Sequence, residues 1–143
     1  MLLGLAACDL LTASPDELKA VFDVSVQGLV ASVQEALADL KAAKGSVLVT
    51  GGGLCNYVDA VDAMAVSWGA MGLAIGKASQ HKTVGLLRAR LDKEGVYVGE
   101  VVVNGMVKGT AFDQGNATLE PSEIAERFWT LHDKRDAYSV PFG

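Results

Sequence analysis

The chain has 143 residues, half of them hydrophobic and a fifth charged, a composition typical of one globular domain rather than of a disordered segment. Its formal net charge of −5 comes with no Lys/Arg cluster to neutralise phosphates, which argues against a nucleic-acid partner. No run approaches the roughly 18 apolar residues that span a bilayer, so we expect no membrane partner.

The cysteines and the N-terminus bear on the compartment. Cys8 and Cys55 are far apart in the sequence and are most simply reduced thiols, which predicts a cytoplasmic protein. The stretch Leu5-Ala-Ala-Cys8 also resembles the cleavage box of a bacterial lipoprotein. A secretory signal needs a basic start, however, and the first basic residue here is Lys19. We therefore favour a buried N-terminal segment over an export signal.

A long amphipathic helix is predicted from Ser14 to about Lys44. Ser14-Pro-Asp-Glu17 has the spacing of a capping box with proline at the first helical position, and Gly45 is a suitable stop. One face is apolar and carries Leu18, Phe22, Leu29, Val33, Leu37 and Leu40. Ser25 falls inside this stripe, where a serine either bonds back to its own helix or belongs to a site.

Two short apolar runs, Gly45–Thr50 and Val96–Val103, have the pattern of fully buried strands. The stretch between them, Asp62–Lys93, has no proline and predicts a helix, at least from Val66 onward. Strand, helix and strand in this order form a right-handed crossover, which predicts a parallel sheet with helices on its faces. The fold class is therefore α/β, as a three-layer structure in a single domain spanning residues 1–143.

Two groups of glycines lie within this strand–helix–strand unit. Thr50-Gly-Gly-Gly53 suggests a nucleotide loop, but the later glycine positions of a dinucleotide fingerprint fall on Cys55 and Tyr57, so we interpret it as a loop after a strand. In the central helix, Gly69, Gly72 and Gly76 share one face, which indicates close approach of another backbone or a ligand. Lys77 lies beside that face.

The remaining features are less specific. Asn104–Leu119 is predicted to be a long loop, Pro121–His132 a short helix, and Tyr138–Phe142 a clipped edge strand, since proline is tolerated there. Lys77 and His81 form a possible polar pair on the helix surface. The acidic residues Asp59, Asp62 and Glu100 are too scattered in the sequence to predict a metal site. Both tryptophans, Trp68 and Trp129, are expected in the core.

In order and spacing, these elements resemble the C-terminal half of a short-chain dehydrogenase/reductase, a Rossmann-type oxidoreductase that uses NAD or NADP. The resemblance covers about Leu11 to Phe142. It rests on the segments Phe22–Gly28, Gly45–Thr50, Ile75–Ala78, Val101–Gly105 and Pro121–Ala125. It implies a partial Rossmann-type fold, with the N-terminal nucleotide-binding half and its phosphate-binding glycines absent from this chain.

The resemblance also assigns roles. The family's lysine, which holds the nicotinamide ribose and lowers the pKa of the catalytic tyrosine, corresponds to Lys77. The tyrosine position is Leu73, the asparagine position is Ser25, and the serine position falls near Gly52. Because leucine transfers no proton, the family's acid–base chemistry is not possible with this set. Lys77 and Ser25 remain as the candidate catalytic residues of a degenerate site.

The cofactor-binding candidates are Lys77 and the turn after the second strand. The family's Pro-Gly turn, which presents backbone to the nicotinamide, appears as Asn104-Gly105 with Val107 following. Two interpretations remain open. One is a divergent, shortened oxidoreductase relative that keeps a remnant of the dinucleotide site. The other is a non-catalytic structural or interaction protein, a homo-oligomer formed through the two long helices; a fragment without a function of its own is a third possibility.

Overall fold

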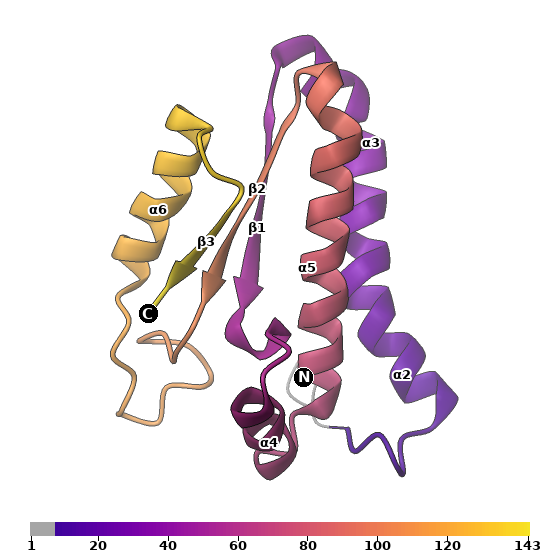
Figure 1. The fold of residues 1–143 in the computed structure, drawn as a ribbon, viewed down its shortest axis with the longest axis vertical. Coiled ribbons are helices and arrows are strands. Elements are labelled where there is room, and N and C mark those ends of the chain that lie inside the picture. Colours follow the sequence, from indigo (N-terminus) through magenta and orange to yellow (C-terminus); the bar gives the residue numbers. More distant parts are fainter. Residues whose placement is uncertain (1–7) are drawn as a thin grey trace.

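The computed structural model describes residues 8–143, which form a parallel three-stranded sheet with helices on both faces (Figure 1). The elements are α2 (Pro15–Phe22), the π-helix η1 (Asp23–Gln27), α3 (Gly28–Ala43), β1 (Ser46–Gly52), the 3₁₀ turn η2 (Gly53–Cys55), α4 (Asp59–Ser67), α5 (Met71–Leu91), the 3₁₀ turn η3 (Asp92–Glu94), β2 (Tyr97–Val103), α6 (Pro121–Lys134) and β3 (Ser139–Phe142). No helix within this range is long and apolar enough to cross a membrane. The stretch Met1–Ala7 lies outside the described residues, and Cys8 is buried.

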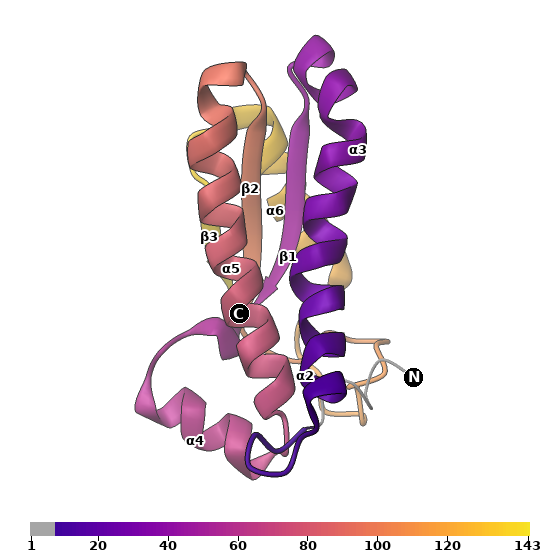
Figure 2. The same ribbon diagram turned by 90° about the vertical axis from the view of Figure 1, so that its right-hand side faces the viewer.

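The strands lie in the order β1-β2-β3, with both pairs parallel, so all three carboxyl ends meet at one edge of the sheet. Figure 2 shows α3 and α5 side by side over one face, with α6 behind the sheet. The predicted three-layer α/β fold with a parallel sheet is confirmed. The strand bounds shift slightly, because Gly51 and Gly52 continue β1 instead of forming a loop.

Successive side chains of each strand point to opposite faces of the sheet, so the sheet separates two hydrophobic cores. The core between the sheet and the helices α3 and α5 contains Val33, Val49, Val84, Leu91, Val96 and Val98. The face toward α6 buries Val101, Ile124 and Leu131. A parallel strand covered on both sides is apolar at nearly every position, and this produces the continuous run of valines in β2.

The first predicted helix exists, but it is not uniform. Ser14 caps it with the expected box, its Oγ accepting from the Glu17 amide at 3.3 Å. The five residues Asp23–Gln27 adopt a π-helical turn, which adds a residue to one turn and rotates the face that follows. Phe22 is consequently 38% exposed, while the adjacent Val21 is buried. The predicted single apolar stripe through Phe22 and Leu29 is therefore wrong.

The helix ends with a left-handed residue, as glycine-stopped helices commonly do. That residue is Lys44, with φ of 48°, and not Gly45. The Gly45 amide donates to the Leu40 carbonyl at 2.8 Å, which satisfies one of the free carbonyls of the last turn.

The central helix is broken where the sequence predicted continuity. α4 ends at Ser67, Trp68 to Ala70 form a connection, and α5 starts at Met71. Gly69 has φ of +61°, which other residues rarely adopt, so this glycine makes the break instead of packing on a helix face. Gly72 and Gly76 are buried in α5. The predicted face shared by three glycines is thus wrong for Gly69.

Both tryptophans also differ from expectation. Trp68 sits in this connection and is 62% exposed, and Trp129 on the outer side of α6 is 70% exposed. The prediction that both tryptophans lie in the core is therefore wrong; on α6 the buried positions are taken by Ile124 and Leu131.

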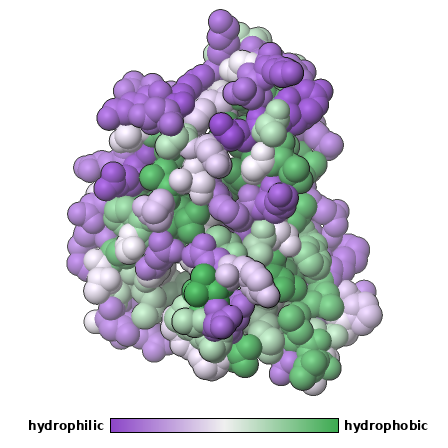
Figure 3. Space-filling model, in the orientation of Figure 1, coloured by the Kyte–Doolittle hydropathy of each residue, from purple (hydrophilic) through white to green (hydrophobic). Residues whose placement is uncertain are grey.

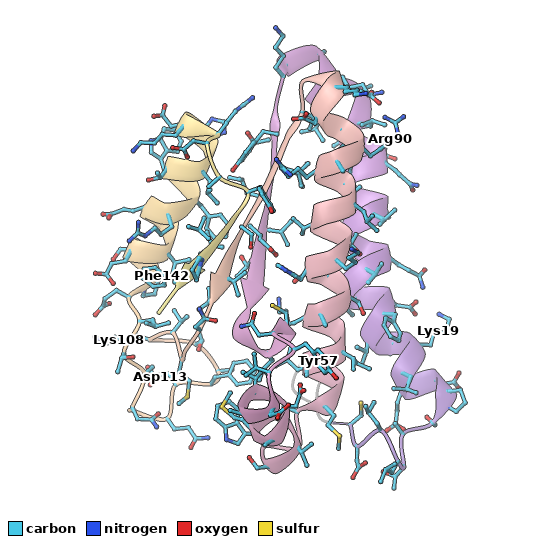
Figure 4. The ribbon with its side chains drawn as sticks, viewed as in Figure 1. Lys19, Tyr57, Arg90, Lys108, Asp113 and Phe142 are labelled. Carbon is cyan, nitrogen blue, oxygen red and sulfur yellow. The ribbon has the colours of Figure 1, made fainter. Side chains whose placement is uncertain are left out.

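The last third of the chain follows the predicted order. Residues 104–119 form a loop below the sheet, held by the Asp113 carboxylate, which accepts from the amides of Gly109, Gly115 and Ala117. One parallel bridge joins Val107 to Leu119. α6 runs two residues beyond the predicted end, and β3 is the predicted edge strand with Pro141 in it. Figure 4 shows Lys108 and Asp113 in this loop, with Phe142 above it.

Candidate functional site

Lys77 lies on the second turn of α5, where that helix passes the carboxyl end of β1. Its Nζ donates to the Thr50 carbonyl at 2.8 Å and to Gln80 Oε1 at 2.9 Å. Its methylene groups pass over Gly52, 3.5 Å from where a Cβ would stand. An ammonium has three N–H donors, so one remains for a further acceptor. The helix thus delivers a cation to the edge of the sheet where ligands of open α/β folds bind.

Burial dominates the electrostatics of this lysine. The loss of solvent lowers the pKa of Lys77, while the nearby Glu100 carboxylate and Cys55 oppose the shift. The pKa of the Cys55 thiol is raised, first by burial and then by Glu100. Cys55 is therefore held as a thiol, and thiols are poor nucleophiles compared with thiolates.

Glu100 is the one charged residue that is fully buried between residues 8 and 143, at 1% exposure. It points from the middle of β2 toward α5, where its Oε1 contacts Nδ1 of His81 and accepts from the Ser139 hydroxyl at 2.8 Å. Its Oε2 has no hydrogen-bond partner among the described residues. A Cβ at Gly51 would stand 3.1 Å from this oxygen, so glycine leaves the carboxylate its space.

The sequence predicted no site role for Glu100 and a possible polar pair of Lys77 with His81. The structure instead joins His81 to Glu100 and Lys77 to Gln80. One sequence signal could have indicated this pairing: Glu100 is a single carboxylate inside an otherwise apolar strand. Because burying an unpaired charge is costly, such a residue predicts a polar partner on the element that covers it.

Ser25 lies in the π-helical turn and packs on α5 next to Lys77. Its Oγ is 2.6 Å from where a Cβ of Gly76 would stand, and Val21 Cγ1 is 3.1 Å from the same point. The hydroxyl makes no hydrogen bond to another residue in the described range. The close approach predicted for Gly76 therefore comes from the chain's own first helix, and not from another subunit.

The turn after β2 lies against the end of β1. Asn104 Oδ1 is 2.5 Å from the Cβ position of Gly53, and the Asn104 amide donates to the Phe142 carbonyl at 2.7 Å. Gly105 faces Leu119, whose Cδ1 is 3.0 Å from its Cβ position. Val107 is half-buried and packs with the α6 core. Asn104 thus borders the glycines near Lys77, whereas Val107 belongs to the opposite layer.

Comparison with solved structures identifies the fold. The chain is similar to a short-chain dehydrogenase from Burkholderia cenocepacia in complex with NADP, with a TM-score of 0.75 and 17% identity over 96% of this chain and 54% of that one. A short-chain dehydrogenase/reductase of unknown function from Caenorhabditis elegans, with cofactor, gives 0.73 and 16% over 95% and 60%. An oxidoreductase of the same family from Brucella ovis, with a partially ordered NAD, gives 0.72 and 16% over 98% and 58%.

This likeness establishes the fold as that of part of a short-chain dehydrogenase/reductase. The chain spans little more than half the length of these neighbours. No family model and no curated protein matches its sequence. The resemblance expected from the order of the elements is thus confirmed at the level of the fold, while the roles of individual residues remain proposals.

Proposed function

We propose that this chain is a catalytically degenerate relative of the short-chain dehydrogenases/reductases that keeps the nicotinamide-ribose end of a dinucleotide site. We infer that residues 1–143 belong to one Rossmann-like domain that acts in the cytoplasm, where the free thiols Cys8 and Cys55 would stay reduced. The observation that carries the proposal is Lys77, a half-buried ammonium held at the carboxyl end of β1 with one N–H donor left for a ligand.

The residues around Lys77 fit one end of NAD or NADP. Lys77 would donate to a ribose hydroxyl, and the backbone of Asn104 and Gly105 would border the nicotinamide ring. When bound, the nicotinamide supplies hydride chemistry. Ser25 packs beside Lys77 through Gly76 and would orient the lysine rather than move a proton. Val107 faces the α6 core, and we give it no contact with the cofactor.

Two features support the loss of catalysis. Leu73 stands one helical turn before Lys77, where a proton donor would be needed, and its side chain has no ionisable proton to transfer. Cys55, a thiol close enough to Lys77 to interact with it, has its pKa raised, first by burial, and remains protonated. Tight cofactor binding would need phosphate anchoring, for which Thr50–Gly53 lacks the fingerprint spacing.

Titration calorimetry with NAD(H) and NADP(H) tests this proposal. The wild-type chain should bind weakly or not at all, and any heat observed should disappear in Lys77→Met but persist in Lys82→Met, which removes an exposed charge from the same helix. Leu73→Tyr should show no change at the reduced-nicotinamide absorbance band with a panel of alcohols and ketones. Micromolar binding by the wild type, or turnover by either protein, would overturn the degenerate assignment.

A second candidate function is helix-mediated homo-oligomerisation. Val24 and Leu86 on the outward sides of η1 and α5 are 55% and 60% exposed. Figure 3 shows apolar residues gathered on the lower right of the molecule, where α2 and the first turns of α5 lie in Figure 1, whereas Leu86 lies toward the other end of α5. Sedimentation of wild type, Leu86→Glu and Val24→Glu tests it. A wild-type monomer at micromolar concentration, or an oligomer that both variants leave intact, would eliminate this candidate.

A further inference from the structure

A second polar site lies at the amino end of the sheet, away from Lys77. A cavity of about 90 Å³ opens where β2 and β3 begin and α5 ends, lined by the two tyrosines, two arginines and two aspartates Tyr97, Tyr138, Arg88, Arg135, Asp92 and Asp136. Ser46, which pairs with Tyr97 at this end of the sheet, precedes Thr50 by four residues along β1, a distance of roughly 13 Å. The two sites are therefore separate.

Both arginines present guanidinium groups that aromatic rings hold in place. Arg88 stacks on the Tyr138 ring, 3.9 Å from its centre, and Arg135 lies 5.7 Å from the centre of Tyr97. Stacking leaves the N–H edges of a guanidinium available, because the contact uses its flat face. Neither arginine forms an ion pair with a carboxylate between residues 8 and 143, although other pairs exist there.

Arg135 is fixed further by its backbone and by hydrogen bonds. It takes the left-handed position after α6, with φ of 52°, where glycine is the usual residue. Its Nε donates to the His132 carbonyl and one Nη donates to Ser46 Oγ, both at 3.2 Å. A guanidinium has five N–H donors, so the group keeps donors for a ligand.

Tyr97 and the two aspartates of the cavity determine how much negative charge faces the two arginines. Burial and Asp136 raise the pKa of Tyr97, against the opposing effect of Arg135 and Arg88, so the phenol stays protonated near neutral pH. Its hydroxyl donates to the Ala137 carbonyl. Tyr97 thus adds no negative charge, and the charges at the cavity are two guanidinium groups against two carboxylates.

We propose that this cavity binds a small oxyanion, the carboxylate or phosphate group of a small molecule, between the guanidinium groups of Arg88 and Arg135. Planar guanidinium forks match both groups through paired charge-assisted hydrogen bonds. The cavity, of about 90 Å³, has room for one such group. The proposal is independent of cofactor binding at Lys77.

The test follows backbone amide resonances of Ala137 and Tyr138 while inorganic phosphate or sodium acetate is added at constant ionic strength, with chloride as the reference. Arg88→Met keeps the side-chain stem, and Arg135→Gly suits the left-handed backbone, so both variants should fold. Arg90→Met is the matched control: Arg90 lies near the same end of α5, pairs with Glu94 and does not line the cavity (Figure 4).

We expect saturable shifts with phosphate, acetate or both, and the response identifies which oxyanion the cavity accepts. Arg88→Met and Arg135→Gly should each weaken binding about tenfold, the effect of losing roughly 1.4 kcal/mol. Arg90→Met should leave it unchanged, and Asp136→Asn should tighten it by removing an opposing charge. Shifts that do not saturate, that chloride reproduces, or that Arg90→Met weakens as much as Arg88→Met would overturn the proposal.

Discussion

Ser25 occupies the space that a side chain at Gly76 would need, with its Oγ 2.6 Å from the Cβ position of that glycine. The contact joins the π-helical turn of the first long helix to the turn of α5 that carries Lys77. Two positions singled out in the sequence for different reasons, a serine inside an apolar stripe and a glycine inside a helix, are therefore the two halves of one close helix crossing.

Gly76→Ala tests this crossing. The added methyl group would overlap Ser25 Oγ and press on Val21, so we expect the free energy of unfolding in urea to fall by about 1–3 kcal/mol. Gly85→Ala is the control on the same helix: apart from the adjacent backbone of α5, no atom lies within 4 Å of its Cβ position, and alanine should stabilise by about 0.5–1 kcal/mol. Adding Ser25→Ala to Gly76→Ala should recover part of the loss. Equal effects of Gly76→Ala and Gly85→Ala would contradict the contact.

His81 is predicted to compensate the buried charge of Glu100. In His81→Ala, Glu100 would keep Ser139 as its described donor, and a buried carboxylate that loses a polar partner is destabilising. Because His81 is 45% exposed, solvent replaces part of the lost interaction, and we expect a cost of about 1–3 kcal/mol. Chemical denaturation near pH 6 measures it.

The companion variant is Glu100→Gln, which keeps the shape of the side chain and removes its charge. In that background His81→Ala should cost much less, so the two substitutions should be strongly coupled in a double-mutant cycle. Additive effects would show that His81 stabilises the chain through its packing and that the ion pair contributes nothing.

Much of the architecture was predictable because each local signal agreed with the global fold. The valine-rich run of β2 required cover on both faces, and the capping box at Ser14 placed the start of the first helix. The break at Gly69 was not predictable from periodicity, because an isolated glycine within a helical pattern is compatible both with continuation and with a left-handed turn. The π-helical turn likewise has no recognised signature in the local sequence, and it lies where the first helix packs on α5.

The candidate site was only partly predictable. The position of Lys77 followed from the spacing of strand and helix, but the pairing of His81 with Glu100 depends on the register of β2 under α5, which spacing alone does not fix. The arginine-lined cavity brings together residues from α5, β2 and the end of α6. Such long-range combinations need the three-dimensional structure, because their members are individually ordinary surface residues.

Gly53 is predicted to be required for the position of Asn104. A Cβ there would stand 2.5 Å from Asn104 Oδ1 and 3.4 Å from its Cα, so Gly53→Ala should push the turn after β2 away from β1 and destabilise by about 1–2 kcal/mol. Asn104→Ala added to Gly53→Ala should restore most of this loss by removing the obstructing amide. Thermal unfolding of the single and double variants measures the effect, and an unaffected Gly53→Ala protein would refute it.

The lowered pKa of Lys77 predicts a specific dependence of stability on pH. Burial makes the folded chain hold this proton less tightly than the unfolded chain does, where the ordinary lysine value is 10.5. Between the folded pKa and 10.5 the unfolded state therefore binds more protons, and stability rises with pH across that window. Lys77→Met lacks this contribution. Urea unfolding from pH 7 to 10.5 should therefore show the wild type gaining stability relative to Lys77→Met as pH rises.

Lys82→Met, which loses an exposed lysine of the same helix, provides the reference profile. If the difference in unfolding free energy between wild type and Lys77→Met stays constant, or changes in favour of the variant as pH rises, the ammonium is not desolvated at the end of β1.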